Sequence, residues 1–245
     1  MTRTKKSTYC TNAEWAGRAD CKHCHVRNLM LFSGLPDDAF DHMLQPIDHF
    51  IFPPGSLLHE PGRHGEFIFS IRRGLVKLIN IAPGGVQRIV RLLGPGSSVG
   101  LELLDGEKGY RHSVVAVNEV DACRIPLTTV KHLQTDYAVL HNQVRERLQE
   151  QLDRADDWIV SMGTGPAKER VVNLLLMLGE ICSDGNGDIE MLHLDDMAAI
   201  VGISIETVSR IIAELKRRRL VYKVANHIYR LETEALSAIV DNTAD

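Results

Sequence analysis

The spacing of apolar residues changes along the chain, and each change marks a different kind of element. Between residues 31 and about 125, short runs rich in Val, Ile, Leu and Phe alternate with Gly and Pro, as in EFIFSIRRGLVKLINIAPGG. This spacing is typical of the strands and turns of a sandwich or jelly roll. We therefore predict a jelly-roll sensor domain over residues 31–127, after a polar arm over residues 1–30.

From residue 128 the apolar residues follow one another at intervals of three and four, with Arg, Glu, Gln and Asp between them. This period predicts one amphipathic helix over residues 128–162, which the sequence GTGP then ends. Such a helix is longer than a small sandwich can cover, so we interpret its apolar stripe as a dimer contact rather than as packing on its own domain. The stripe contains Leu140, Val144, Leu148, Leu152, Ala155 and Ile159.

Residues 163–245 predict a small α-rich domain that ends in a hairpin. The sequence LDDMAAIVGISIETVSRIIAELKRRRLV contains a helix, a turn at Gly202, an N-cap at Ser204 and a second helix, which is a helix-turn-helix pattern. One face of the second helix is apolar and the opposite face is small and polar. The apolar face carries Ile205, Val208, Ile212 and Leu215, and the other carries Glu206, Ser209, Arg210 and Ala213.

The polar face of that helix suits the edges of base pairs in double-stranded DNA. Arg210 can donate two hydrogen bonds to guanine, Glu206 can accept one from cytosine, and Ser209 can contact a neighbouring base or phosphate. The basic run that begins with Lys216 and Arg217 would lie over phosphates. The alternative is an ordinary solvated face, because the domain holds nine basic against thirteen acidic residues.

Composition limits the class of protein. The 245 residues are 44% hydrophobic and 24% charged with a net charge of −4, which is typical of a soluble globular protein, and no apolar run is long enough to span a membrane. We expect a cytoplasmic location and no membrane partner. The chain lacks a glycine-rich nucleotide loop before a helix, an HExxH and a GxSxG, so nothing predicts an enzyme.

Three of the five cysteines lie in the polar arm, at Cys10, Cys21 and Cys24. In a reducing compartment a CxxC pair is more often a metal or redox site than a disulfide. Taken alone, Cys21 and Cys24 are also compatible with half of a zinc site completed by His23 or His25. Cys182 lies in an apolar helical segment and is interpreted as structural.

The order of these parts resembles the CRP/FNR family of bacterial transcription regulators over nearly the whole chain. The segment IETVSRIIAEL is similar to the recognition helix of the FNR branch, in which Glu, Ser and Arg at this spacing read a TTGA-containing half-site. The resemblance implies an α+β fold with a cyclic-nucleotide-binding-like β jelly roll, a long dimerisation helix and a winged helix-turn-helix. It also implies a homodimer on inverted repeats, and a transcription activator that contacts RNA polymerase.

The same resemblance gives the arm cysteines a role. Oxygen sensors of the FNR branch hold a [4Fe–4S] cluster with four cysteines, and DCKHCHVRNLM and VDACRIP resemble its two ligand segments. Cys21, Cys24 and Cys123 then match ligands, whereas the remaining family position falls on Met30. Cys10 is the candidate to replace it, since a ten-residue spacer closes at little extra entropic cost.

The resemblance also bears on other ligands. Cyclic-AMP-binding members carry a Gly-Glu-Leu cassette and an Arg-Ser pair, but here the segments read Gly100-Leu101-Glu102 and Arg111-His112-Ser113. We therefore expect no cyclic nucleotide. The alternatives are a haem sensor of nitric oxide or carbon monoxide that uses His49, His59 or His64, and a regulator without a cofactor.

The dimer helix departs from the FNR branch at one position. An acidic residue of that branch opposes pairing of the cluster-free form, and the corresponding position here is Ala155. A methyl group carries no charge, so we expect the protein to dimerise appreciably without its cluster.

Overall fold

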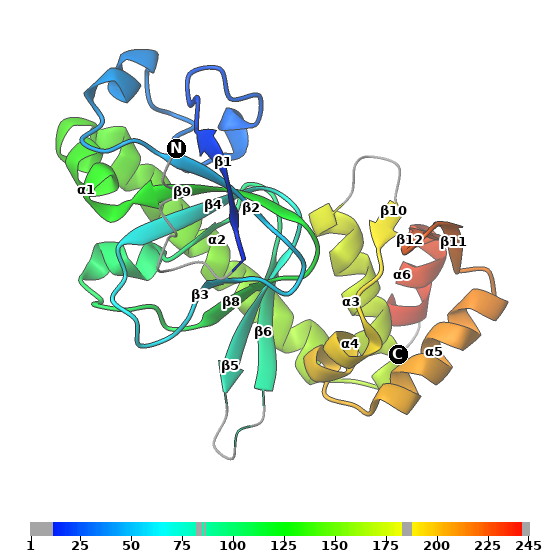
Figure 1. The fold of residues 1–245 in the computed structure, drawn as a ribbon. Helices are drawn as coiled ribbons and strands as arrows, with labels where there is room; N and C mark the ends of the chain where they lie inside the picture. Colours follow the sequence, from blue (N-terminus) through cyan, green and yellow to red (C-terminus); the bar gives the residue numbers. More distant parts are fainter. Residues whose placement is uncertain (1–11, 82–84, 86, 183–187, 242–245) are drawn as a thin grey trace. The chain divides into compact units, whose positions relative to one another are not determined.

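The computed structural model describes residues 12–81, 85, 87–182 and 188–241. The chain divides into two units, of which the first comprises residues 1–80 and 92–151 and the second comprises residues 81–91 and 152–245. Cys10, one of the expected cluster ligands, lies outside the described residues. Figure 1 shows the order of the elements along the chain.

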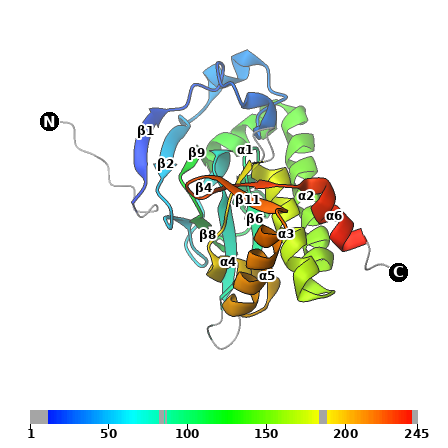
Figure 2. The ribbon, with the colours of Figure 1, turned by 90° about the vertical axis from the view of Figure 1, so that its right-hand side faces the viewer.

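Two antiparallel sheets form the β-rich part of the chain, as the sequence predicted for residues 31–127. One has the order β1-β2-β9-β4-β7 and the other β3-β8-β5-β6. In Figure 2, β1 lies at the outer edge of the first sheet, beyond β2. The strands are β1 Glu14–Arg18, β2 Asp48–Phe52, β3 Leu57–His59, β4 Phe67–Arg73, β5 Val76–Ile81, β6 Gln87–Leu93, β7 Ser98–Val99, β8 Ser113–Ala116 and β9 Val120–Pro126.

Strand β1 was not predicted, because every one of its residues except one is exposed and the segment shows no apolar alternation. It forms through backbone pairing with β2, in which Glu14 lies opposite Ile51 and Arg18 opposite Asp48. The arm is therefore attached to the edge of the sheet from Glu14 onward. Three short 3-10 helices complete this part of the chain, η1 Arg27–Leu29, η2 Asp37–His42 and η3 Leu101–Asp105.

A single apolar core joins the arm, the first sheet and the helices that follow it. Its buried residues fall into three groups along the chain. The segment that follows the arm supplies Leu31, Phe32, Leu35, Ala39, Phe40 and Ile47; β4, η3 and β9 supply Ile68, Leu101, Cys123 and Ile125; and the helices supply Val130, Leu133, Leu140 and Val144.

The predicted single helix over residues 128–162 is two helices, α1 Leu127–Asp136 and α2 Ala138–Gly163. Tyr137 interrupts it with an extended backbone at φ −126° and ψ 95°, and its N–H still bonds the Leu133 carbonyl at 2.8 Å. The Tyr137 side chain packs against the core just described. Periodicity could not reveal the break, because an apolar residue at this position fits both a continuous helix and a bend that buries it.

The second unit contains the helix-turn-helix. Its described elements are α3 Ala167–Cys182, β10 Asp188–Glu190, α4 Leu194–Val201, α5 Ile205–Arg217, β11 Val221–Ala225, β12 Ile228–Leu231 and α6 Thr233–Asp241. The three strands form an antiparallel sheet in the order β10-β12-β11. None of the helices within the described ranges is long and apolar enough to cross a lipid bilayer.

The predicted turn between α4 and α5 is confirmed. Gly202 ends α4 in the left-handed region at φ +69°, a conformation that glycine adopts without a side-chain clash. Ser204 caps α5, and its Oγ accepts a hydrogen bond from the N–H of Thr207 at 3.3 Å.

Candidate functional site

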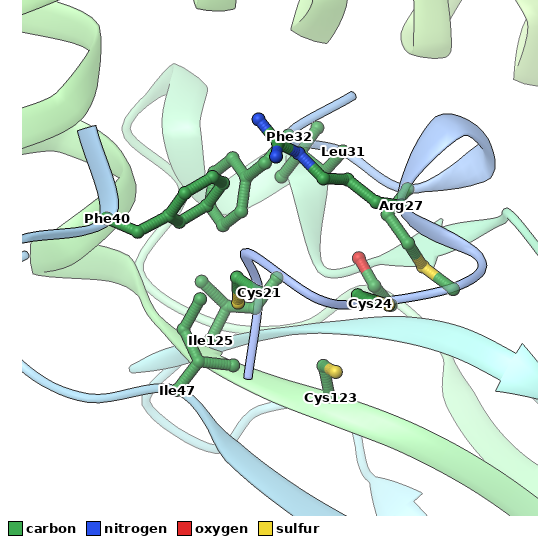
Figure 3. Close-up of a pocket in the computed structure, with 11 residues that line it drawn as sticks. Cys21, Cys24, Arg27, Leu31, Phe32, Phe40, Ile47, Cys123 and Ile125 are labelled. Atoms are coloured by element: carbon green, nitrogen blue, oxygen red, sulfur yellow. The ribbon is translucent and has the colours of Figure 1, made fainter. Parts of the chain in front are cut away.

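Cys21, Cys24 and Cys123 line one pocket of the first unit, with an empty volume of about 360 Å³ that includes open solvent (Figure 3). Cys123 follows Cys24 by about a hundred residues in the sequence, but the fold places both at the same pocket. Two polar side chains, Arg27 and Ser70, share this lining. The rest is apolar and consists of Met30, Leu31, Phe32, Phe40, Ile47 and Ile125. We call this the sulfur pocket.

Strand pairing fixes the position of Cys123. On β9 it lies opposite Ser70 of β4 and opposite His49 of β2. Its side chain belongs to the apolar core and is only 9% exposed. The hydroxyl of Ser70 is bonded to that of Ser98 at 2.9 Å, so the wall of the pocket beside Cys123 is held by a buried hydrogen bond.

Local hydrogen bonds shape the arm loop that carries Cys21 and Cys24. The carboxylate of Asp20 accepts from the N–H of His23 at 3.2 Å, and the Cys24 carbonyl accepts from the N–H of Arg27 at 3.0 Å. These bonds turn the chain between the two cysteines and the start of η1. Cys21 packs against the apolar core and is partly buried.

Arg27 was missed by the sequence reasoning, although it follows Cys24 by three residues in the same arm. Its Nη1 donates to Asp37 and its Nη2 to the carbonyl of Leu35. The guanidinium carbon lies 4.8 Å from the centre of the Phe40 ring, which is a cation–π distance. Its Nε is buried and has no hydrogen-bond partner.

Burial makes two thiols of the sulfur pocket, those of Cys21 and Cys123, weak acids. It raises the pKa of Cys21 to about 11, with a further rise from the neighbouring Cys24. Burial likewise raises the pKa of Cys123 to about 12. These thiols are therefore protonated at neutral pH, and a metal group that binds them must displace protons.

The donors of the sulfur pocket are three thiols, a ligand type found both in zinc sites and in iron–sulfur clusters. Within the described ranges, no group of three or more Cys, His, Asp or Glu side chains is placed to hold a metal ion. The half-site for zinc is not completed there, since His23 and His25 are both exposed and His23 bonds Asp20. A four-iron cluster puts iron and sulfide between its ligands, so its cysteines stand farther apart than the ligands of one ion.

The predicted DNA-reading side chains share the exposed face of α5. Glu206, Ser209 and Arg210 are all exposed, and so are Lys216 and Arg217 at the end of the helix. The buried face holds Val208, Ile211, Ile212 and Leu215, so the expected apolar face is corrected at one position. Ile205 is 44% exposed, because the first residue of a helix has no preceding turn to cover it.

Ion pairs and hydrogen bonds fix α5 and the charge of its first turn. The backbone N–H of Glu206 and the Ser204 hydroxyl lower the pKa of the Glu206 carboxyl, which keeps it an ionised acceptor. Glu214 pairs with Lys168 of α3 at 2.6 Å and fixes the helix from its inner side. The ammonium of Lys216 lies 4.4 Å from the centre of the Tyr229 ring and so contacts β12 as well.

The six side chains assigned to the dimer stripe do not share one environment. Leu140 and Val144 are 0% and 6% exposed and belong to the apolar core of the first unit, so their own chain covers them. Leu148 packs partly against the same core. The assignment of Leu140 and Val144 to a dimer contact therefore needs correction.

The other three positions of the stripe retain free surface. Leu152 and Ile159 are 55% and 65% exposed, and Ala155 lies between them and is half-buried. An apolar stripe over residues 152–159 remains for a partner.

Two regions of the chain match family models. Residues 50–137 match the cyclic nucleotide-binding domain, and residues 169–239 match the Crp-like helix-turn-helix domain. The chain belongs to the CRP/FNR family of transcription regulators. The predicted fold class is thereby confirmed, and the family consists of DNA-binding regulators, typically dimers, rather than enzymes.

The relatives of this CRP/FNR regulator carry different names. It is 28% identical over 193 residues to the "Cyclic AMP receptor protein" of Thermus thermophilus, covering 78% of this chain and 87% of the relative. It is 22% identical over 227 residues to the "Transcriptional activator protein anr" of Pseudomonas aeruginosa, covering 91% and 93%. The structure of FixK2 from Bradyrhizobium japonicum shares the fold, with a TM-score of 0.70, 18% identity and coverage of 78% of this chain and 96% of that one.

Replacing Arg210 should separate base reading from phosphate binding. Arg210→Ala removes a bidentate donor, and we expect it to cost about 1–3 kcal/mol at a TTGA inverted repeat while binding to random DNA stays nearly unchanged. Arg217→Ala is the matched control, since a phosphate contact should weaken both DNAs alike. Fluorescence anisotropy with both duplexes measures this, and equal losses in the two variants would show that Arg210 contacts only the backbone.

Proposed function

We propose that this regulator senses oxygen or cellular redox state through a [4Fe–4S] cluster and reads TTGA-type inverted repeats as a homodimer. The observation that carries the proposal is the meeting of Cys21, Cys24 and Cys123 at one pocket. Cys10 supplies the fourth thiolate. The bound cluster contributes a redox-active group that oxygen can oxidise, and the protein contributes the thiolates and an apolar enclosure.

The DNA-binding part of the proposal rests on the exposed face of α5. Glu206, Ser209 and Arg210 lie within four residues of one another near its N-terminus, which is the end that enters a major groove. A two-fold contact along residues 152–159 would present two such helices about 34 Å apart, one turn of DNA. In this proposal the dimer also contacts RNA polymerase as an activator.

We also propose that the sensor domain binds no cyclic nucleotide. The side chain of Arg111, in the segment that would hold the cyclic phosphate, is 66% exposed and forms an ion pair with Glu107. Its backbone N–H faces Glu102, the acidic residue of the other segment, at 3.3 Å. We expect calorimetric titration with cyclic AMP to give no saturable heat, and a saturable signal would contradict this part of the proposal.

A haem sensor is the second candidate, and His59 is the observation that favours it. The imidazole is 5% exposed and stacks on the Tyr110 ring, with 3.8 Å between the ring centres. Burial lowers the pKa of His59 to about 3, so the ring is in its neutral, metal-binding form. Of the other two candidates, His49 pairs with Asp121 and His64 is exposed.

Serine variants of the five cysteines test the cluster directly. After anaerobic reconstitution, we expect the wild-type protein to show a broad absorption near about 400 nm that bleaches in air. Cys10→Ser, Cys21→Ser, Cys24→Ser and Cys123→Ser should each lose it, because a serine oxygen is a poor substitute for a soft thiolate. Iron and sulfide analysis gives the occupancy.

Cys182→Ser is the matched control and should keep the full chromophore, since Cys182 ends α3 in the other unit. A full cluster in Cys10→Ser would remove Cys10 from the ligand set. A sharp Soret band in the wild-type protein that is lost in His59→Ala would show that the cofactor is haem and not an iron–sulfur cluster.

The cluster-free protein should form dimers at micromolar concentration. Ala155 lies between the exposed Leu152 and Ile159 and brings no charge into the contact. Ala155→Asp should shift the equilibrium to monomer by placing two carboxylates in one seam, whereas Ala155→Ser should stay dimeric. Sedimentation velocity of air-exposed protein measures this, and a wild-type monomer that pairs only after reconstitution would refute it.

A further inference from the structure

We propose that Arg27 is a positioning residue of the sulfur pocket. The positive charge of Arg27 compensates the negative charge of the cluster and raises the reduction potential of the cluster. This rests on the proposed function, because it assumes that the three cysteines of the pocket hold an iron–sulfur group. It goes beyond it by assigning a role to a side chain that is not a ligand.

The need for a cation follows from the composition of the pocket. Four thiolates outweigh the positive charge of a [4Fe–4S] core, so the ligated cluster is an anion. Six of the side chains that line the pocket are apolar and cannot compensate a charge. An anion enclosed by such side chains is costly to bury unless a donor or a positive charge lies beside it.

Arg27 meets that need. Of the lining side chains in the described part of the chain, it is the only one that carries a positive charge. In Figure 3 the Arg27 side chain runs along the top of the pocket, its guanidinium nitrogens lie beside Phe32, and the three cysteines lie below it.

The contacts of Arg27 hold its charge in place and leave a donor free. The two Nη atoms donate hydrogen bonds to Asp37 and to the Leu35 carbonyl, and the guanidinium packs on the Phe40 ring. Nε is left buried without a partner, which is costly in a finished core. A cluster sulfur or a ligating thiolate would give this N–H an acceptor, and hydrogen bonds to sulfur are one of the factors that set cluster potentials.

Asp37 does not cancel this charge within the pocket. Its side chain is 72% exposed, whereas that of Arg27 is 20% exposed. Water screens the carboxylate, but the guanidinium lies against the apolar lining, where charge interactions are stronger.

The alternative is that Arg27 only holds the arm in shape through Asp37 and Leu35. The two roles predict different outcomes when Arg27 and Asp37, the partners of the ion pair, are replaced one at a time. If the pair is structural, Arg27→Gln and Asp37→Asn break the same contact and should have similar effects. If charge matters, the two changes alter the charge near the cluster in opposite directions.

The experiment is a redox titration of the anaerobically reconstituted full chain, followed by its visible spectrum. Arg27→Gln should lower the equilibrium constant for one-electron reduction of the cluster at least tenfold. This corresponds to a fall of about 59 mV in the reduction potential. Arg27→Lys should restore most of that loss, because it keeps the charge. Asp37→Asn should leave the potential unchanged or higher, and Arg145→Gln, at an exposed position of α2, controls for the loss of a positive charge elsewhere.

Two results would overturn the assignment. One is an unchanged potential in Arg27→Gln at full iron and sulfide content, and the other is a fall in Asp37→Asn that equals the fall in Arg27→Gln. If Arg27→Gln fails to fold by circular dichroism, Arg27→Lys and Asp37→Asn still decide between the two roles. A wild-type protein that holds no iron and sulfide would instead refute the proposed function itself.

Discussion

The packing of the arm and of the segment that follows it, residues 19–47, against one face of the five-stranded sheet is the constraint on which the first unit depends. Cys123 and Ile125 of β9 present that face, and Leu31, Phe32 and Phe40 cover it from the arm side. Without this packing the buried face of β9 would be exposed to water, at about 25 cal/mol for each Å² of apolar surface. The same contact brings the three cysteines together, so the sulfur pocket is a consequence of the core and not an addition to it.

The arm also binds α2 directly. The Nη2 of Arg147 donates to the carbonyl of Leu29 at 3.1 Å, and the side-chain amide of Gln143 lies 2.8 Å from the hydroxyl of Ser33. Leu29 and Ser33 flank Met30, which lines the sulfur pocket. A change in the arm therefore acts on α2 within one or two residues of the pocket, and α2 continues into the stripe at residues 152–159.

Periodicity and turn chemistry predicted those parts of the fold that one local rule determines. The strands of the sandwich, the Ser204 cap and the exposed polar face of α5 are of this kind. The rest depended on tertiary packing. An apolar stripe does not say which of two surfaces it covers, so Leu140 and Val144 were assigned to a partner although the core of their own unit buries them.

The candidate site was predictable to a similar extent. The type of donor could be inferred from CxxC and from the distant cysteine, because thiols in a polar arm have few other uses. The lining of the pocket could not, since it comes from segments as far apart as Arg27, Ser70 and Ile125. Arg27 has no sequence signal of its own, because a basic residue in a polar arm is ordinarily solvated.

The number of contacts between the arm and α2 bears on how strongly such a pocket can regulate DNA binding. A ligand shifts a conformational equilibrium only by the difference in its interaction with the two states. The bonds of Arg147 and Gln143 to the arm contribute about 0.5–1.5 kcal/mol each, and the loss of both amounts to about 1–3 kcal/mol. That is the usual size of an allosteric coupling, roughly 5–150-fold in affinity. The two hydrogen bonds that join residues 29–33 to α2 are therefore comparable in energy to a usual allosteric coupling.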